Sequence, residues 1–212
     1  DNPYQGLVQV SRYNLRVYKM TKYTRKKRKL VCGVGINDAD YTLHHTVDGK
    51  KVMCHFYSVW HDMVARCYSE RIHKIYPTYI GCTVASEWLS FSNFKLWMEG
   101  QEWQGKQLDK DILIQGNKVY SPSTCIFVTK RINTLLNNHS NSRGRYPLGA
   151  AFSKEKGKYI ASCSAYGKVR FLGYYDTPEE AHEVYKTFKY KYIAEVANQQ
   201  SEPLKSALLN YV

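Results

Sequence analysis

Residues 107–133 read QLDKDILIQGNKVYSPSTCIFVTKRIN, and this stretch decides the fold of the middle of the chain. Between residues 108 and 114 apolar and polar side chains alternate imperfectly, which predicts a strand. The GNK triplet then predicts a turn, and the apolar run CIFV at 125–128 predicts a returning strand. Thr129 is placed to cap a helix that runs through Leu136.

Two side chains that can bind a metal ion, Asp109 and Asn133, lie near the ends of this stretch. Carboxylate and amide oxygens are ligands of hard divalent cations. The residue types alone leave two interpretations open. The stretch is either a metal-binding site, or a hairpin packed on a helix with a solvated carboxylate and a surface amide.

Upstream, apolar side chains recur at helical spacing over residues 56–69 (FYSVWHDMVARCYS) and 87–100 (EWLSFSNFKLWMEG). We expect a helix over each range, with Gly100 ending the second. Both aromatic stripes indicate core packing. Residues 32–58 predict short strands, and Asp48-Gly49 is a favourable hairpin turn.

The downstream region, residues 146–200, predicts a small unit of its own. Three strands are expected over 148–152, 158–163 and 168–174. Thr177 and Pro178 then suit the cap and the first position of a helix. Its expected apolar face, which would cover one side of the sheet, consists of Ala181, Val184, Tyr185, Phe188 and Tyr192.

Charge is the strongest global signal, since Lys and Arg number 31 against 18 Asp and Glu, a net charge of +13. Such an excess favours a polyanionic partner, and we expect double-stranded DNA. Residues 1–31 form the expected basic N-terminal arm. Its phosphate-contacting side chains would be Lys22, Arg25, Lys26, Lys27 and Arg28.

The six cysteines are widely and irregularly spaced: Cys32, Cys54, Cys67, Cys82, Cys125 and Cys163. Buried free thiols are expected, with a structural Zn²⁺ site built from some of them and a histidine as the alternative. No stretch approaches the roughly 20 apolar residues that span a bilayer, and no signal peptide opens the chain. We therefore expect no membrane association and a cytoplasmic location, in the host cell if a phage encodes the protein.

Five motifs follow one another through the middle segment, Trp60 to Asn133: RCYS at 66–69, YPTYIGCTV at 76–84, EWLSFSNF at 87–94, LDKD at 108–111 and YSPSTC at 120–125. In this order they resemble motifs of the HNH, or His-Me finger, endonucleases that are common in phages. The resemblance implies an α+β protein with a ββα-metal nuclease core and flanking helices over residues 32–137. No GxGxxG, Walker or GxSxG motif occurs, which argues against nucleotide-dependent and serine-hydrolase chemistry.

The C-terminal unit resembles the ethylene-response-factor (Apetala-type) DNA-binding domain. PLGAAF, GKYIAS and VRFLGYYDTPEEAHEVY carry the resemblance. It implies a small three-stranded antiparallel sheet packed on one helix, which lays its other face into the major groove. The expected DNA-binding side chains on that face are Lys158, Ser162, Ser164, Lys168, Arg170 and Phe171. Residues 138–145 would be the linker and 201–212 a C-terminal tail.

The nuclease resemblance implies that Asp109 and Asn133 bind one divalent ion, Mg²⁺ or alternatively Mn²⁺. Lys110 stands where the family usually has its histidine base, and Thr124 where an asparagine often braces that base. A lysine is protonated at neutral pH and cannot accept a proton. The base is then Asp111, which on a strand would face away from Lys110, or an imidazole from His55 or His61. Otherwise the site is inactive.

These observations favour a phage-type metal-dependent DNA endonuclease or nickase, of the homing type, that the sheet domain directs to DNA. The alternative is a catalytically decayed DNA-binding protein, a repressor or inhibitor on the same fold, which rests on Lys110 and Thr124. A third interpretation is a protein that binds an acidic partner through its basic arm.

Overall fold

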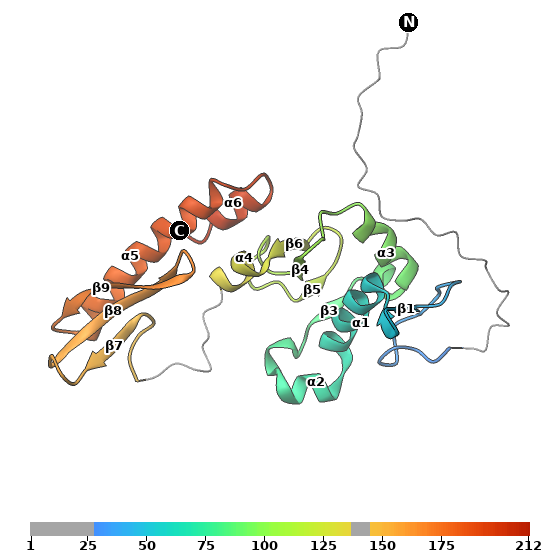
Figure 1. The fold of residues 1–212 in the computed structure, drawn as a ribbon, viewed down its shortest axis with the longest axis horizontal. Coiled ribbons are helices and arrows are strands. Elements are labelled where there is room, and N and C mark those ends of the chain that lie inside the picture. The colour runs from blue at the N-terminus through green and yellow to red at the C-terminus, as the bar shows by residue number, and fades with distance from the viewer. Residues whose placement is uncertain (1–27, 137–144) are drawn as a thin grey trace, which may run out of the picture.

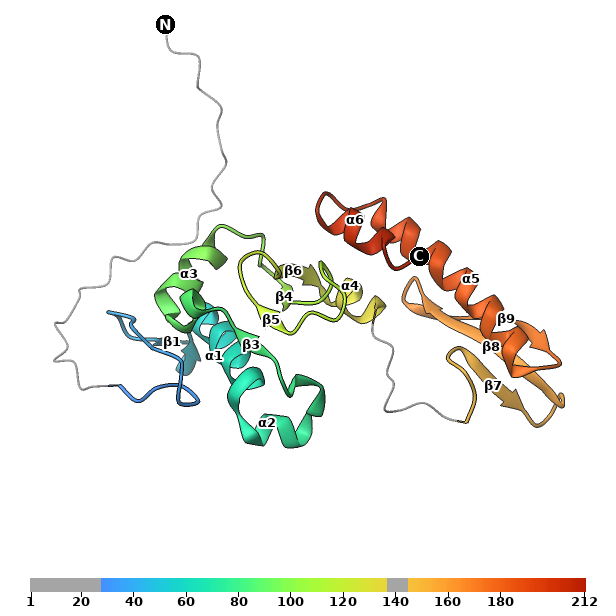
Figure 2. The ribbon, with the colours of Figure 1, turned by 180° about the vertical axis from the view of Figure 1, so that it is seen from behind.

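The computed structural model describes residues 28–136 and 145–212. The chain is a mixed α+β protein with four small sheets among the described residues, in agreement with the expected α+β class. The middle elements β4, β6 and α4 lie between the helices α1–α3 and the C-terminal sheet with α5 (Figures 1 and 2). The expected arm residues Lys22, Arg25, Lys26 and Lys27, and most of the expected linker, lie outside the described residues. Among the described helices, none is both long and apolar enough to cross a membrane.

A hairpin and a helix open the described part of the chain. Strands β1 (His44–Val47) and β2 (Lys50–Met53) pair antiparallel, and the turn residues Asp48 and Gly49 both have positive φ, 49° and 75°. This is the tight turn that the sequence predicted. Helix α1 (His55–Tyr68) matches the helix expected over 56–69. It is followed by α2 (Glu70–Ile75) and the 3₁₀ turn η1 (Pro77–Tyr79).

The prediction of one continuous helix over residues 87–100 is wrong. The structure has a 3₁₀ turn, η2 (Ser86–Leu89), and then helix α3 (Phe91–Glu99). Ser90 interrupts them because its hydroxyl accepts the N–H of Asn93 as an N-cap and donates to the carboxylate of Asp38 at 2.6 Å. Gly100 does end the helix, but with φ −81° rather than in the left-handed region.

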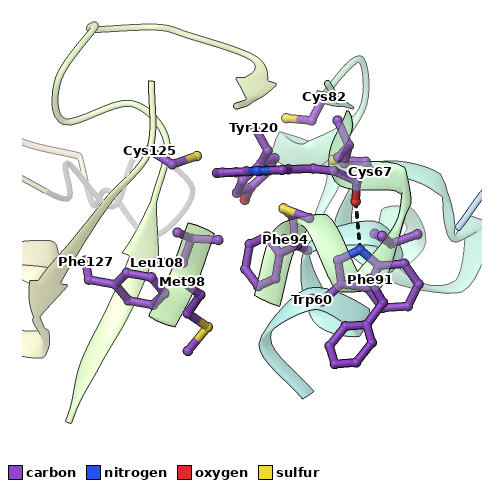
Figure 3. Close-up of a cluster of buried hydrophobic side chains, with 14 of the residues drawn as sticks. Trp60, Cys67, Cys82, Phe91, Phe94, Met98, Leu108, Tyr120, Cys125 and Phe127 are labelled. Atoms are coloured by element: carbon purple, nitrogen blue, oxygen red, sulfur yellow. Dashed lines mark hydrogen bonds between the residues drawn. The ribbon is translucent and has the colours of Figure 1, made fainter. Parts of the chain in front are cut away.

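The first core gathers around α1, η2 and α3 (Figure 3). Trp60 and Trp88 are almost fully buried, and the Trp60 indole donates to the backbone oxygen of Trp88 at 2.7 Å. The RCYS motif serves this packing, because Cys67 is buried in the core and the Tyr68 hydroxyl accepts the N–H of Val84 at 3.0 Å. The aromatic stripes are therefore core, as expected.

Residues 106–135 form three short strands and a helix. β4 (Lys106–Asp109) pairs antiparallel with β6 (Ile126–Thr129), whereas β5 (Val119–Tyr120) pairs in parallel with β3 (Thr83–Val84). Helix α4 (Lys130–Leu135) follows, and the Thr129 hydroxyl caps it as predicted.

The expected strand over 108–114 is too long. Asp109 ends it, because its Oδ1 accepts the backbone N–H groups of Asp111 and Ile112, both at 2.9 Å. An aspartate that binds the backbone two and three residues ahead turns the chain away from the extended path. Ile114 is consequently exposed in the loop rather than placed on a strand.

The C-terminal unit has the expected elements, an antiparallel sheet in the order β7-β8-β9 with one helix against it. The strands are β7 (Ala150–Ser153), β8 (Lys158–Ala165) and β9 (Lys168–Tyr175), and the helices are α5 (Pro178–Ala197) and α6 (Leu204–Leu209). Thr177 and Glu180 form a capping box at the start of α5. The segment expected as a C-terminal tail thus contains a helix.

A second core joins this unit to the middle of the chain. Buried Val128 and Ile132 of the middle elements pack in one cluster with Ile193 of α5 and Leu208 of α6. The Arg131 guanidinium also donates twice to the Tyr192 hydroxyl, at 2.9 and 3.1 Å. The hairpin of β4 and β6 therefore has a core on each side.

Gly149 provides a test of the packing between the sheet and α5. A Cβ at this position, where φ is +84°, would lie 2.1 Å from Cγ of Tyr185. We expect Gly149→Ala to lower the free energy of unfolding by about 1–3 kcal/mol more than Gly157→Ala, in denaturant titrations. Gly157 is the matched control because it also has positive φ, +62°, but open space around it. Equal losses in the two variants would contradict the close approach.

Candidate functional site

Asp109 lies half-buried at the end of β4, where its carboxylate is held by the two backbone N–H groups described above. Burial raises the pKa of this carboxyl, and the neighbouring Asp111 carboxylate raises it further. The two acids therefore sit close enough to repel each other. Such a pair is a favourable place for a cation.

Lys110 is buried, with 7% of its surface exposed, and does not point into solvent. Its Nζ donates to the backbone oxygen of Asn117 at 2.9 Å and to Oδ2 of Asp111 at 3.2 Å. The expectation that Lys110 and Asp111 face opposite sides of a strand is wrong, because the strand has already ended at Asp109 and both residues lie in the following bend. Lys110 thus neutralises Asp111.

Asn117 is a residue that sequence reasoning missed. Its amide donates to the backbone oxygens of Lys110 at 2.6 Å and Val119 at 2.7 Å, while its Oδ1 accepts the N–H of Val119 at 3.1 Å. The Lys110 ammonium group in turn donates to the backbone oxygen of Asn117. These hydrogen bonds close the loop that carries Asp111. The GNK triplet was a usable signal, since asparagine in a turn often binds the nearby backbone.

Asn133, the other expected metal ligand, lies half-buried on α4. Its Nδ2 donates to Oε1 of Gln107 at 2.9 Å. Gln107 and Asp109 are two residues apart on β4, so their side chains share one face of the strand. Asn133 therefore lies against the face of β4 that carries Asp109, beside Gln107, which is two residues before Asp109.

Thr124 does not brace a base. Its hydroxyl donates to the backbone oxygen of Val119 at 2.7 Å and contacts the Ser121 hydroxyl at 2.9 Å. Both contacts hold the turn between β5 and β6. Thr124 is thus a support of the backbone near the site.

Tyr211 is the second residue that sequence reasoning missed. From the end of the chain its hydroxyl donates to the backbone oxygen of Asp111 at 3.2 Å. Burial raises the pKa of this phenol, and the carboxylates of Asp111 and Asp109 raise it further. No local pattern could have found it, because the contact joins residues one hundred positions apart.

The two histidines considered as bases make other contacts. His55 stacks on Trp103 with ring centroids 5.0 Å apart, and His61 lies 3.7 Å from the Asp62 carboxylate on its own helix. All six cysteines are free thiols, and four of them are buried. Within residues 28–136 and 145–212, no group of three or more His, Cys, Asp or Glu could hold a metal ion.

Helix α5 covers one face of the C-terminal sheet, and the opposite face of the sheet is left open. Ala161, Cys163 and Ala165 are buried toward the helix. Directly paired residues of antiparallel strands share a face. The pairing therefore gives the residues of what we name the open face: Ala151, Ser153, Lys158, Ile160, Ser162, Ser164, Val169, Phe171 and Tyr174.

Four of the six expected DNA-binding residues lie on the open face, namely Lys158, Ser162, Ser164 and Phe171. Lys168 and Arg170 do not, because they pair with the buried Ala165 and Cys163 on the helix side. Arg170 there lies over the Tyr166 ring, 5.5 Å from its centroid. Grouping Arg170 with its neighbour Phe171 was wrong, since adjacent strand residues point to opposite faces.

A β-bulge adds to this change of face. The pairing shifts between Ala161 and Ser162, whose partners on β9 are Gly173 and Phe171, so Leu172 has no direct partner. The extra residue brings Tyr174 to the same face as Phe171, and their rings meet edge to face at 5.0 Å. A sequence pattern read with a strict period of two cannot detect this.

Of the five arm side chains expected to contact phosphates, only Arg28 lies within the described residues. Its guanidinium donates to Oδ1 of Asn37 at 2.8 Å and to the Asn37 backbone oxygen at 3.3 Å. Val31, the last residue of the expected arm, pairs with Gly35 and packs against the first core. The C-terminal end of the arm is thus attached to the folded part of the chain.

Comparison with family models, with curated proteins and with solved structures finds no match for this chain. The two resemblances noted in the sequence therefore stay predictions. The geometry of the described residues is what supports or weakens each of them.

The raised pKa of Asp109 predicts a pH-dependent effect of removing its charge. A carboxyl whose pKa is higher in the folded than in the unfolded state costs stability once the pH exceeds both values, and costs nothing below both. Asp109→Asn keeps an oxygen for the N–H groups of Asp111 and Ile112. Without metal, we expect this variant to unfold at higher denaturant than the wild type at pH 7. The gain should shrink as the pH falls through the raised pKa, and a gain that grew in acid would contradict the assignment.

Tyr211→Phe tests the link between the end of the chain and the site. Loss of the hydrogen bond to Asp111 should lower the free energy of unfolding by about 0.5–1.5 kcal/mol. Tyr76→Phe is the control, because Tyr76 is 55% exposed and its side chain makes a ring contact with Tyr79 rather than a hydrogen bond. A Tyr211 variant as stable as the control would argue against the contact.

Proposed function

We propose that this protein is a phage-type metal-dependent DNA endonuclease or nickase that hydrolyses phosphodiester bonds in double-stranded DNA. The observation that carries the proposal is the arrangement of β4, β6 and α4. This hairpin and helix bring Asn133 to the strand face that carries Asp109, with a second carboxylate, Asp111, beside it. The net charge of +13 supports a nucleic-acid substrate.

The residues at this site fit a magnesium ion. Mg²⁺ is usually bound through one or two carboxylates together with water and substrate phosphates, so a complete protein cage is not needed. Asp109 supplies the ligand carboxylate, and the neighbouring Asp111 adds negative charge beside it. The Nδ2 of Asn133 is committed to Gln107, which leaves its Oδ1 as the ligand oxygen. When bound, the divalent ion supplies Lewis-acid polarisation of the scissile phosphate.

The same geometry favours Asp111 over Lys110 as the proton acceptor. Lys110 donates to Asp111 and to Asn117, and an ammonium group has no acceptor. Asp111 has a carboxylate next to the ligand Asp109, and Lys110 and Tyr211 hold its segment in place. In this proposal Lys110 orients Asp111, and Asp111 takes the proton of the attacking water.

The C-terminal sheet is the proposed targeting element. Its open face carries Lys158, Ser162, Ser164 and Phe171, and a sheet can enter the major groove as a helix does. Because the second core and the Arg131 bonds join this unit to the middle elements, DNA on the sheet would be held at a defined position relative to Asp109.

Cleavage of plasmid DNA with Mg²⁺ or Mn²⁺, with EDTA as the control, tests the activity directly. We expect Asp109→Ala and Asn133→Ala each to reduce cutting by at least about 100-fold, an effect typical of lost catalytic groups, while duplex binding persists. Asp62→Ala, which removes an exposed carboxylate on α1, should cut as the wild type does. If a plasmid that carries a bound site stays intact with every metal, the endonuclease proposal fails.

Metal binding can be measured without activity. Because Mg²⁺ would relieve the repulsion between Asp109 and Asp111, millimolar Mg²⁺ or Mn²⁺ should raise the melting temperature of the wild type. Asp109→Asn lacks one of the two charges and should show little or none of this shift. An equal rise in both proteins would show that the ion binds elsewhere.

A non-catalytic DNA-binding protein is the second candidate, and the buried, fully engaged Lys110 favours it. Nothing at this position can act as the usual histidine base. This alternative requires tight, salt-sensitive duplex binding that needs no metal, and no cutting under any metal condition. The plasmid assay and a binding titration with EDTA together separate the two candidates.

A further inference from the structure

The open face carries a row of exposed apolar side chains along its edge strand β9. Val169, Phe171 and Tyr174 are 73%, 58% and 44% exposed, and all three come from β9. On the neighbouring strand they pair with Ser164, Ser162 and Ile160. Large apolar side chains that share one exposed face usually mark a binding surface.

The open face also lacks the side chains that read most bases. In the major groove guanine is read by Arg or Lys, adenine by Asn or Gln, and cytosine by Asp or Glu. Among the nine residues of the open face the sole charged or amide side chain is Lys158, and it lies at 3.0 Å from the Asp176 carboxylate. Thymine is the remaining base, and it presents a C5-methyl group to apolar side chains.

We propose that the open face recognises thymine methyl groups in the major groove, so that the protein selects sites rich in A·T base pairs. This inference rests on the proposed function, because it assumes that duplex DNA is the ligand. Val169 and Phe171 supply the apolar contacts. Ser162 and Ser164 supply small hydroxyls that tolerate any base beside them.

The charge around the open face fits a duplex. Lys154 and Lys156 lie in the turn between β7 and β8, so cations stand beside the open face at the end where β8 begins. Eight strand residues span roughly 25 Å, about twice the width of the major groove. The lysines of the β7–β8 turn can therefore reach a phosphate backbone, while the apolar row of β9 meets the bases.

Uracil in place of thymine tests this inference, because it removes the methyl group and leaves the base pair intact. The full-length Asp109→Ala variant is used in EDTA at one fixed salt concentration, with duplexes selected from a random pool. We expect selected duplexes to be rich in A·T pairs, and uracil substitution to weaken binding about fourfold for each methyl group that the open face buries.

Variants then locate the contact. Val169→Ser and Phe171→Ser should remove most of the difference between thymine and uracil duplexes, whereas Lys154→Ala should weaken binding to both equally. Val47→Ser is the matched control, since Val47 is 47% exposed on the distant β1–β2 hairpin. Thermal melts of each variant verify that the fold is intact, as expected for such exposed positions.

Each outcome decides the matter. Binding that is equal for thymine and uracil duplexes overturns the thymine inference and leaves the proposed endonuclease standing, which plasmid cutting tests separately. Failure to bind any duplex overturns both. If binding ignores uracil and Phe171→Ser instead abolishes a concentration-dependent self-association, the open face docks a second copy of the chain.

Discussion

The hairpin of β4 and β6 lies between two hydrophobic cores, and the arrangement of the rest of the molecule depends on this. Leu108 and Phe127, which pair directly, point into the first core, and Val128 points into the second. Successive strand residues alternate between faces, so the neighbours Phe127 and Val128 let the short strand β6 serve both cores. The hairpin thereby fixes the candidate site against the upstream helices and the C-terminal unit alike.

Burial of this kind has an electrostatic consequence at the end of β4. Asp109 must leave water to occupy its position, and the cost appears as a raised pKa. The two backbone N–H groups offset part of that cost and turn the chain. Lys110 compensates the adjacent Asp111, which leaves the charge of Asp109 without a cationic partner in this segment. A divalent cation would balance that charge, which is the physical basis of the proposed metal site.

The C-terminal unit contributes to the candidate site as well as to the proposed targeting. Tyr211 reaches the backbone of Asp111, and Arg131 of α4 binds the Tyr192 hydroxyl, which also accepts the N–H of Tyr166. The turn between β8 and β9 and the α4 helix are therefore linked by hydrogen bonds through Tyr192. These contacts exist only when the C-terminal unit is packed against the middle elements.

By itself the sequence determined the elements with strong local signals. Helix α1, the Asp48-Gly49 turn, the Thr129 cap, and the three strands followed by the capped α5 were all predicted from periodicity and capping residues. It also determined the charge, and it singled out Asp109 and Asn133. These features depend on neighbours within a few positions, which a sequence displays directly.

Only the tertiary structure decided the rest, because it depends on residues that are distant in sequence. Asp38 stabilises the break at Ser90, and the bulge near Leu172 moves Tyr174 to the open face. Lys168 and Arg170 lie on the helix side because they pair with the buried Ala165 and Cys163. Tyr211 lies beside Asp111 because the second core folds α6 back toward the middle elements. Burial, and with it the pKa of Asp109 and the engagement of Lys110, exists only once both cores have formed.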